Sequence, residues 1–401
     1  MKKSKILVVH NYYLRPSGED TMFSAEARLL RSSGHEVIEY VEDNRRIGDM
    51  SRGHVALDTI WSRKSYQNIR ELLERERPQV AHFHNTFPLL SPSAYYACRE
   101  MRVTVVQTLH NYRLICPVAY LFRDGHVCEE CVGKLLPWPG VRYGCYHHSR
   151  TTTAVVAGML SLHRMLGTWQ DKVDAYIAVS DFGRRKFIEG GLPAEKIEVK
   201  SNFIDPDPGE GLNRDRFALF VGRLSPEKGI GVLLRAWEDL EAIPLKIAGV
   251  GPLDRLVERF AETHPRVEYL GQQEREQILK LMKSARFLIV PSEWYEGFPM
   301  VIAEAFACGL PVISSSLGSL TELVTPGATG LLFSPSNSNE LLQKALWAWE
   351  HPQELAQIGR NARRRYEERY TAEKNYEQLA GIYERAVARA RNTSAKTNAK
   401  R

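Results

Sequence analysis

The chain has 401 residues, of which 43% are hydrophobic, and its formal net charge is +6 at neutral pH. This length suits two domains of ordinary size, and the composition allows each of them to bury a core. The modest positive charge permits an anionic partner but does not require nucleic acid. The sequence lacks the run of about 18 apolar residues that a membrane-spanning helix needs, and the short apolar run after the basic N-terminus predicts a strand rather than a signal peptide. We therefore expect a cytoplasmic protein.

In the first half of the chain, short apolar runs alternate with amphipathic stretches. KILVVH at 5–10 predicts a buried parallel strand, and a helix with Phe23, Ala27 and Leu30 on one face is expected after it. Strand–helix alternation of this kind is typical of a parallel sheet with helices on both faces. Further strands are expected at HEVIEY, PQVAHFHN (78–85), VTVVQTLHN (103–111) and VDAYIAVS (173–180).

The segment 203–215, FIDPDPGEGLNRD, is rich in proline, glycine and aspartate, which is typical of a linker between domains. The alternation then begins again, and two such systems predict an α/β protein of two Rossmann-like domains, 1–205 and 206–374, facing each other across a cleft. Ligands of open α/β sheets bind at the carboxyl ends of the strands, so we expect chemistry there. Strands of the second domain are expected at FALFVGR, PLKIAGVG, RVEYLG, ARFLIVPS and LPVISSS.

The string EGFPMVIAEAFACG at 296–309 is the strongest signal, because it follows an expected strand and begins an expected helix. Gly297 allows a ligand close to the backbone, and Pro299 suits the first turn of a helix, whose free N–H groups bind anions. Glu304 lies in an otherwise apolar helix, where a carboxylate needs hydrogen bonds that ribose hydroxyls would supply. Glu296, just before the helix, is placed to reach other hydroxyls. The alternative is that both glutamates are surface groups.

The second signal is LFVGRLSPEKG at 219–229, in which Arg223 and Lys228 follow the end of an expected strand. Two cations there suit a diphosphate, since arginine offers a planar fork and lysine a point charge. A diphosphate neutralised in this way needs no metal, so we expect none for catalysis. The alternative interpretation is a pair of solvated surface cations.

Three signals are weaker. IAGVGP at 247–252 predicts a turn after a strand, and Gly18 in SGED follows the first strand, where it would let the backbone meet a ligand. His110 ends the strand VTVVQTLH and is expected to face the cleft. Each of these residues has an ordinary alternative, since a lone glycine is usually a turn and a lone histidine is usually packed or solvated.

Together, RLSPEKG, IAGVGP and EGFPMVIAEAFACGLPVI resemble the retaining glycosyltransferases of family 4, which have the GT-B fold, and the similarity extends over nearly the whole chain. The resemblance implies that Arg223 and Lys228 bind the diphosphate of a nucleotide-sugar donor and that Glu304 binds its ribose. It also implies that Glu296 binds the transferred sugar and that His110 lies beside it. Backbone contacts with sugar and phosphate carry over to Gly297, Phe298, Pro299 and Met300.

Two positions depart from the family pattern. SGED stands where many members have two glycines, which weakens the assignment of Gly18 to donor binding, and Val250 stands where an acidic residue is common. The GT-B fold implies that the last helix, at about 375–391, crosses back to the N-terminal domain. The remaining residues, 392–401, are basic and polar and are expected to form a disordered tail.

Four cysteines lie within 30 residues, in a predicted insert at 111–150, with the spacing C-x11-C-x2-C-x13-C. This pattern suits a tetrahedral zinc site, and four thiolate ligands would make it structural. Free thiols and, less readily in the cytosol, disulfides are the alternatives, and His147 or His148 could replace one ligand. The candidate ligands are Cys116, Cys128, Cys131 and Cys145.

These patterns predict a glycosyltransferase that moves a sugar from a nucleoside diphosphate sugar to an acceptor hydroxyl without a catalytic metal, and the family resemblance implies that the anomeric configuration is retained. The acceptor is expected to be a saccharide or a lipid-linked saccharide of a surface polysaccharide or glycolipid, with peripheral contact at the inner face of the cell membrane. The sequence leaves two alternatives open, an epimerase of nucleotide sugars with the same fold and a zinc-containing nucleic-acid-binding protein. The acidic and apolar character of EGFPMVIAEAFACG opposes the second.

Overall fold

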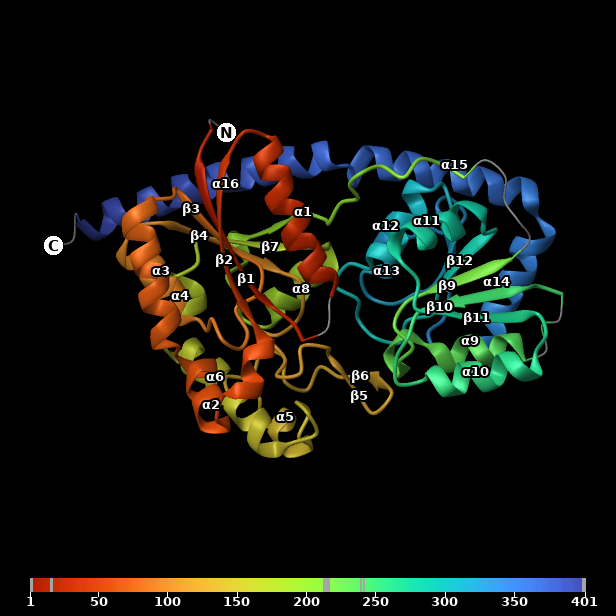
Figure 1. The fold of residues 1–401 in the computed structure, drawn as a ribbon, viewed down its shortest axis with the longest axis horizontal. Helices are drawn as coiled ribbons and strands as arrows, with labels where there is room; N and C mark the ends of the chain where they lie inside the picture. The colour runs from red at the N-terminus through yellow and green to blue at the C-terminus, as the bar shows by residue number, and fades with distance from the viewer. Residues whose placement is uncertain (1–2, 15–16, 212–216, 239, 241, 399–401) are drawn as a thin grey trace. The chain divides into compact units, whose positions relative to one another are not determined.

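The structure is a computed structural model that describes residues 3–14, 17–211, 217–238, 240 and 242–398. The chain divides into two compact units. The first unit contains residues 1–121, 129–201 and 375–401, and the second contains 122–128 and 202–374. Each unit has its own parallel sheet with helices around it (Figure 1). Among the described residues, no helix combines the length and the apolar character that crossing a bilayer requires.

The first unit is built on a six-stranded parallel sheet with the order β2-β1-β3-β4-β7-β8. The strands expected from the sequence are confirmed, and β8 is an additional strand. β1 is buried along nearly its whole length because helices cover both faces of the sheet. The strands are β1 (Lys5–Tyr12), β2 (Glu36–Asp43), β3 (Val80–Phe83), β4 (Thr104–Leu109), β7 (Ala175–Ala178) and β8 (Ile197–Val199).

The helices of the first unit include most of α16, the last helix of the chain. Leu379 and Tyr383 of α16 pack in one core with Ile6, Val80 and Val106 of the sheet. The helices are α1 (Gly18–Ser32), α2 (Arg52–Ile60), α3 (Arg63–Glu76), α4 (Ser93–Glu100), α5 (Trp138–Tyr143), α6 (Arg150–Met165), α7 (Thr168–Asp171), α8 (Asp181–Glu189) and α16 (Ala372–Asn398), with the short 3₁₀ helices η1 (Asn44–Asp49) and η2 (Ala194–Lys196).

The second unit has a six-stranded parallel sheet with the order β11-β10-β9-β12-β13-β14, so that β9 and β12 are neighbours in its centre. A small antiparallel hairpin of β5 (Phe122–Arg123) and β6 (His126–Val127) is assigned to the same unit. The sheet strands are β9 (Ala218–Val221), β10 (Leu245–Ala248), β11 (Val267–Gly271), β12 (Phe287–Val290), β13 (Val312–Ser315) and β14 (Gly330–Phe333).

The helices of the second unit bury two apolar clusters against this sheet. One cluster contains residues of α12, and the other contains residues of α9. The helices are η3 (Pro226–Lys228), α9 (Ile230–Trp237), α10 (Asp254–Thr263), α11 (Arg275–Ser284), α12 (Met300–Ala307), α13 (Leu320–Leu323), α14 (Ser338–Glu350) and α15 (Pro352–Arg369).

Three segments differ from the sequence-based expectation. The predicted linker at 203–215 begins inside the second unit, where Ile204 forms a bridge with Thr371, while its residues 212–215 lie outside the described residues. The predicted tail at 392–401 is helical through Asn398, because α16 continues, and residues 399–401 lie outside the described part. The insert at 111–150 contains the hairpin β5–β6 and α5, and α6 begins at its last residue, Arg150.

Candidate functional site

The loop after β9 and the loop after β12 approach each other closely in the second unit. β9 and β12 are adjacent parallel strands, so their carboxyl ends meet at one edge of the sheet. Gly229 has φ of +73°, and a Cβ atom there would lie 1.7 Å from the Pro291 carbonyl oxygen. Glu293 N also donates to the Glu227 carbonyl oxygen at 2.9 Å. Only glycine allows this approach at position 229, which brings the residues around Lys228 beside those around Glu296.

Lys228 and Glu296 form the central ion pair of this region. Lys228 Nζ lies 2.7 Å from Glu296 Oε1, and Ser292 Oγ donates to the same oxygen at 2.7 Å. Glu296 is buried, and its carbonyl oxygen accepts a hydrogen bond from Ser319 Oγ at 2.7 Å. Lys228 Nζ also lies 5.2 Å from the ring centroid of Trp294. Two residues that the sequence assigned to diphosphate and sugar are therefore in direct contact.

Arg223, the second predicted cation, lies in the same loop. Its guanidinium contacts the Glu227 carboxylate, and Ser225 Oγ donates to that carboxylate at 2.8 Å. Burial opposes ionisation of Glu227, but the hydrogen bonds from Arg223 and Ser225 outweigh it and lower its pKa. An arginine has five N–H donors and a lysine three, so Arg223 and Lys228 can each keep a carboxylate partner and still bind phosphate oxygens.

The helix α12 begins one residue later than the sequence suggested. Pro299 is its N-cap rather than its first helical residue, and among the described residues no side chain caps the N-terminus. The first N–H groups of α12, beginning at Met300, are therefore the kind of group that binds an anion. Gly297 and Phe298 lie in the preceding loop, between Glu296 and the helix.

Glu304 lies one turn after the start of α12, and its carboxylate is largely buried. Burial raises the pKa of Glu304, while the charge of Arg275 acts in the opposite direction. Arg275 Nε is 3.6 Å from Glu304 Oε1, which is too long for a hydrogen bond. This carboxylate is thus poorly compensated, as expected for a group that completes its hydrogen bonds with a ligand.

The turn IAGVGP packs against the backbone of the Arg223 loop. Gly249 has φ of +139°, and a Cβ atom there would lie 1.9 Å from the Gly222 carbonyl oxygen. Leu224 N donates to the Val250 carbonyl oxygen at 3.1 Å. The glycine therefore fixes the shape of the loop that carries Arg223, and Val250 is exposed at the tip of the turn.

In the first unit, His110 lies directly after β4 and contacts a second histidine. His110 Nε2 is 2.9 Å from His84 Nδ1, and the two rings are stacked. Burial lowers the pKa of His110 to about 3 and that of His84 well below its usual value, so both rings are neutral at neutral pH. The sequence identified His110 and missed His84, although the alternating histidines of HFHN place two of them on one face of a strand.

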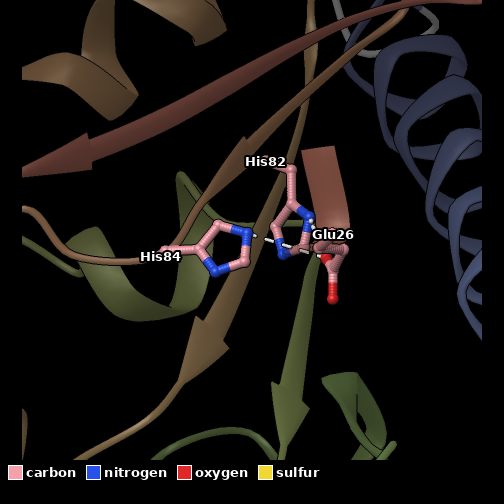
Figure 2. A group of neighbouring side chains, drawn as sticks. All are labelled: Glu26, His82 and His84. Atoms are coloured by element: carbon pink, nitrogen blue, oxygen red, sulfur yellow. Dashed lines mark ion pairs between the residues drawn. The ribbon is translucent and has the colours of Figure 1, made fainter. Parts of the chain in front are cut away.

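The buried carboxylate of Glu26 lies beside His82 and His84 (Figure 2). Glu26 Oε1 is 3.1 Å from His82 Nδ1 and 3.6 Å from His84 Nε2. Its other oxygen is 2.7 Å from Lys200 Nζ. Burial would raise the pKa of Glu26, but Lys200 and His82 outweigh it and hold the pKa well below its usual value. Glu26, His82 and His84 are residue types that can bind a metal ion. The Lys200 ammonium, however, already neutralises the Glu26 carboxylate.

The SGED segment, which begins α1, contains a second residue that the sequence analysis missed. Gly18 is the first residue of α1, which is capped by Ser17 in a capping box with Asp20. The next residue, Glu19, accepts hydrogen bonds from Asn111 Nδ2 at 2.8 Å and from the Tyr13 hydroxyl at 3.0 Å. Burial raises the pKa of Glu19 to about 7. A carboxyl group that titrates near neutral pH therefore lies beside the loop that follows His110.

Two family descriptions match the chain over consecutive regions. "Glycosyltransferase Family 4" matches residues 21–208, and "Glycosyl transferases group 1" matches residues 206–365. The chain belongs to the group 1 glycosyltransferases of family 4. The expectation drawn from RLSPEKG and EGFPMVIAEAFACGLPVI is thereby confirmed for the family.

The curated relatives of this family 4 chain match it over about half of its length or less. D-rhamnosyltransferase WbpZ of Pseudomonas aeruginosa is 35% identical over 163 residues, which are 39% of this chain and 42% of that protein. O-antigen chain mannosyltransferase B of Escherichia coli is 32% identical over 200 residues, which are 44% of this chain and 51% of that protein. The chain thus spans about half the length of the curated relatives it matches.

Solved structures share the fold of this family 4 chain over nearly its whole length. Anabaena HepE in complex with UDP has a TM-score of 0.65 and 19% identity, covering 94% of this chain and 98% of that chain. Sucrose-phosphate synthase of Thermosynechococcus elongatus has a TM-score of 0.71 and 17% identity, covering 96% and 100%. These similarities establish the GT-B fold.

One Asp-x-Asp sequence, Asp205-Pro206-Asp207, bears on the expectation that this glycosyltransferase family member needs no catalytic metal. Both oxygens of Asp207 are bound by the Arg363 guanidinium, each at 2.7 Å. These hydrogen bonds lower the pKa of Asp207. The arginine thus occupies the carboxylate that a cation would need, and the motif serves to hold the chain against α15.

The four predicted zinc ligands form no disulfide bond in the structure. Among the described residues, the four sulfur atoms do not form a group in which three or more ligand atoms lie within 4.8 Å of one another. Cys128 is assigned to the second unit and the other three to the first. Cys131 Sγ lies 3.8 Å from the Pro137 carbonyl oxygen. The predicted ligands are Cys116, Cys128, Cys131 and Cys145, and zinc binding by them stays a prediction.

Proposed function

We propose that this protein transfers a sugar from a nucleoside diphosphate sugar to an acceptor hydroxyl, with retention of the anomeric configuration. The observation that supports this most is the contact between Lys228 and Glu296, since it joins a phosphate-binding type of residue to a hydroxyl-binding one at a strand edge. A ligand that needs both groups must combine an anion with a polyol. A sugar diphosphate meets this requirement.

In the proposed reaction, the bond between the anomeric carbon and the diphosphate oxygen breaks, and the diphosphate leaves with the electron pair. Arg223, Lys228 and the N-terminus of α12 would stabilise the growing negative charge, because preorganised donors act most strongly where charge develops. The acceptor oxygen then bonds to the anomeric carbon on the face that the leaving group vacated, and its proton passes to the diphosphate. This balance of charge requires no metal ion.

The two glutamates have separate roles in this proposal. Glu296, which the Lys228 ammonium and the Ser292 hydroxyl keep in place, accepts hydrogen bonds from hydroxyls of the transferred sugar. Glu304, which is largely buried and lies too far from Arg275 for a hydrogen bond, accepts them from the ribose. His110 and the backbone from Gly297 to Met300 complete the set of groups that hold the donor.

The acceptor in this proposal is a saccharide or a lipid-linked saccharide of a cell-surface polysaccharide or glycolipid, used at the cytoplasmic face of the membrane. Support comes from the relatives whose names refer to O-antigen and rhamnose transfer. The nucleotide-sugar donor is supported by the structures of HepE with UDP and with UDP-glucose.

Thermal unfolding in the presence of UDP, UDP-glucose and GDP-mannose tests the donor. A ligand at 100 times its dissociation constant adds about 2.7 kcal/mol of stability, so a true donor raises the unfolding midpoint clearly. Incubation of that donor with an extracted glycolipid acceptor, followed by NMR of the product, gives the anomeric configuration. An inverted product would contradict retention, and isomerised sugar without acceptor would indicate an epimerase instead.

A further inference from the structure

An exposed apolar surface lies on the first unit, in the insert that contains Cys131 and Cys145 and at the end of the helix that follows it. It is formed by the segment that enters α5 and by the last turns of α6. Each member keeps between 37% and 65% of its surface exposed. The members of this apolar patch are Leu135, Leu136, Trp138, Leu162, Met165 and Leu166.

Hydrogen bonds hold the two parts of the apolar patch together. Ser161 Oγ donates to the Leu135 carbonyl oxygen at 2.9 Å, and the Arg164 guanidinium donates to the Lys134 carbonyl oxygen. Residues 162, 165 and 166 are spaced so that they share one face of α6. Figure 1 shows α5 beside α6, and the two helices pack against each other. The patch is therefore a continuous surface rather than scattered side chains.

The stretch of chain that carries the apolar patch contains no acidic residue, although the exposed Glu130 and Asp171 flank it. Residues 131–170 contain no aspartate or glutamate and four lysines or arginines, whereas the whole chain has 48 acidic residues in 401. Three of these cations, Lys134, Arg142 and Arg150, are exposed. Apolar side chains with exposed cations on the same segments are the complement of an anionic lipid surface.

We propose that the apolar patch and these three cations bind the surface of an anionic phospholipid bilayer. The leucine and methionine side chains would enter the boundary of the acyl chains, Trp138 would lie at the level of the headgroups, and the cations would contact lipid phosphates. This inference rests on the proposed function, because it brings the enzyme to the surface that holds a lipid-linked acceptor. A second copy of the chain is a poorer partner, since a two-fold contact through the patch would bring like charges together.

Cosedimentation with vesicles tests this surface without any sugar nucleotide. The full-length protein is mixed with phosphatidylcholine vesicles, with and without phosphatidylglycerol, at low and high salt. We expect binding that requires phosphatidylglycerol and weakens with salt. The double variant Leu136→Asp/Trp138→Asp should bind at least tenfold more weakly, and Lys134→Ala/Arg142→Ala should lose most of the dependence on phosphatidylglycerol. Leu256→Asp, an exposed leucine of α10 in the second unit, is the matched control and should bind like the wild type.

A fluorescence measurement covers the case in which the double variant fails to fold. Vesicles that contain brominated lipids should quench the tryptophan fluorescence of the wild-type protein. The quenched component should be the one that is missing from the fluorescence of Trp138→Leu. The proposal is overturned if the protein does not sediment with phosphatidylglycerol, if the double variant binds like the wild type, or if the variant changes only the oligomeric state in sedimentation velocity. A protein that binds vesicles but transfers no sugar would contradict the proposed function alone. A protein that transfers sugar but does not bind vesicles would contradict only the proposed membrane-binding surface.

Discussion

His84 Nε2 faces Glu26 Oε1 at 3.6 Å, and the same carboxylate oxygen lies 3.1 Å from His82 Nδ1. Because Glu26 stays ionised beside Lys200, an N–H group at His84 Nε2 is the favoured arrangement. His84 Nδ1 is then an acceptor, and the neutral His110 must donate from its Nε2. Through His84, the Glu26 carboxylate thus favours the His110 tautomer in which Nδ1 carries a lone pair. That nitrogen can accept a hydrogen bond from a sugar hydroxyl.

This arrangement predicts the tautomer of His110. Nitrogen-15 NMR of the imidazole groups should find His110 protonated at Nε2 and not at Nδ1. In His84→Gln, His110 should lose its preference for the Nε2 tautomer. We expect kcat to fall by about tenfold or more, because His110 is then no longer held with its Nδ1 lone pair toward the substrate. His163→Gln, which removes another buried histidine of the same unit, should leave the His110 signals unchanged. A proton on Nδ1 in the wild-type protein would contradict the assignment.

Glu19 predicts a dependence of stability on pH. Its pKa is raised to about 7 in the folded protein from 4.5, so the folded state holds the proton between these values and stability falls as pH rises through that window. Glu19→Gln removes the titration and keeps hydrogen-bonding groups. We expect the variant to be more stable than the wild type at pH 8 by about 1 to 3 kcal/mol, and the difference should vanish near pH 4. Urea unfolding at both pH values measures it, and a difference that does not change with pH would count against the shift.

The cations of the β9 loop predict transfer that resists chelation. Activity should survive EDTA in a short assay, while Arg223→Ala or Lys228→Ala should lower kcat by about 100-fold or more, as loss of one preorganised donor does. Lys280→Ala, which changes an exposed lysine of the same unit, is the control and should be active. Complete dependence on added Mg²⁺ or Mn²⁺ would show that these cations do not replace a metal.

The two glutamates should separate in their kinetics. Glu304→Ala removes a contact that the ribose makes before and during the reaction, so it should mainly raise the donor KM. Glu296→Ala removes a contact with the reacting sugar and should also lower kcat. Steady-state kinetics with varied donor concentration compares them. If both variants lose kcat equally at unchanged KM, the roles are assigned wrongly.

Zinc binding by the four cysteines of the insert remains testable by elemental analysis of protein purified without chelator. We expect one zinc per chain, held by Cys116, Cys128, Cys131 and Cys145, and a looser insert after its removal, since binding energy becomes local folding energy. Cys98 and Cys308, which are buried in the two cores, should not contribute. A zinc content near zero together with four titratable thiols would reject the site.

The fold could be predicted because local patterns and tertiary structure agree. The spacing of Phe23, Ala27 and Leu30 predicts a helix with one apolar face, and all three side chains are buried in α1. The contact between Lys228 and Glu296 was not predictable, because it depends on a close approach of two loops whose contacting residues are 68 positions apart in the sequence. Glu26 was missed for a related reason. A glutamate on an amphipathic helix is usually solvated, and only the sheet shows that it is buried.

The last helix makes the order of synthesis matter for folding. Residues 379–386 of α16 supply part of the core around β1 and β3, and the Tyr383 hydroxyl contacts His82 Nδ1 at 2.8 Å. A nascent chain therefore cannot complete the first unit until the residues of the second unit, and then α16, have left the ribosome. The N-terminal half should remain a substrate for chaperones until that moment, and an early stop codon before α16 would leave its sheet uncovered.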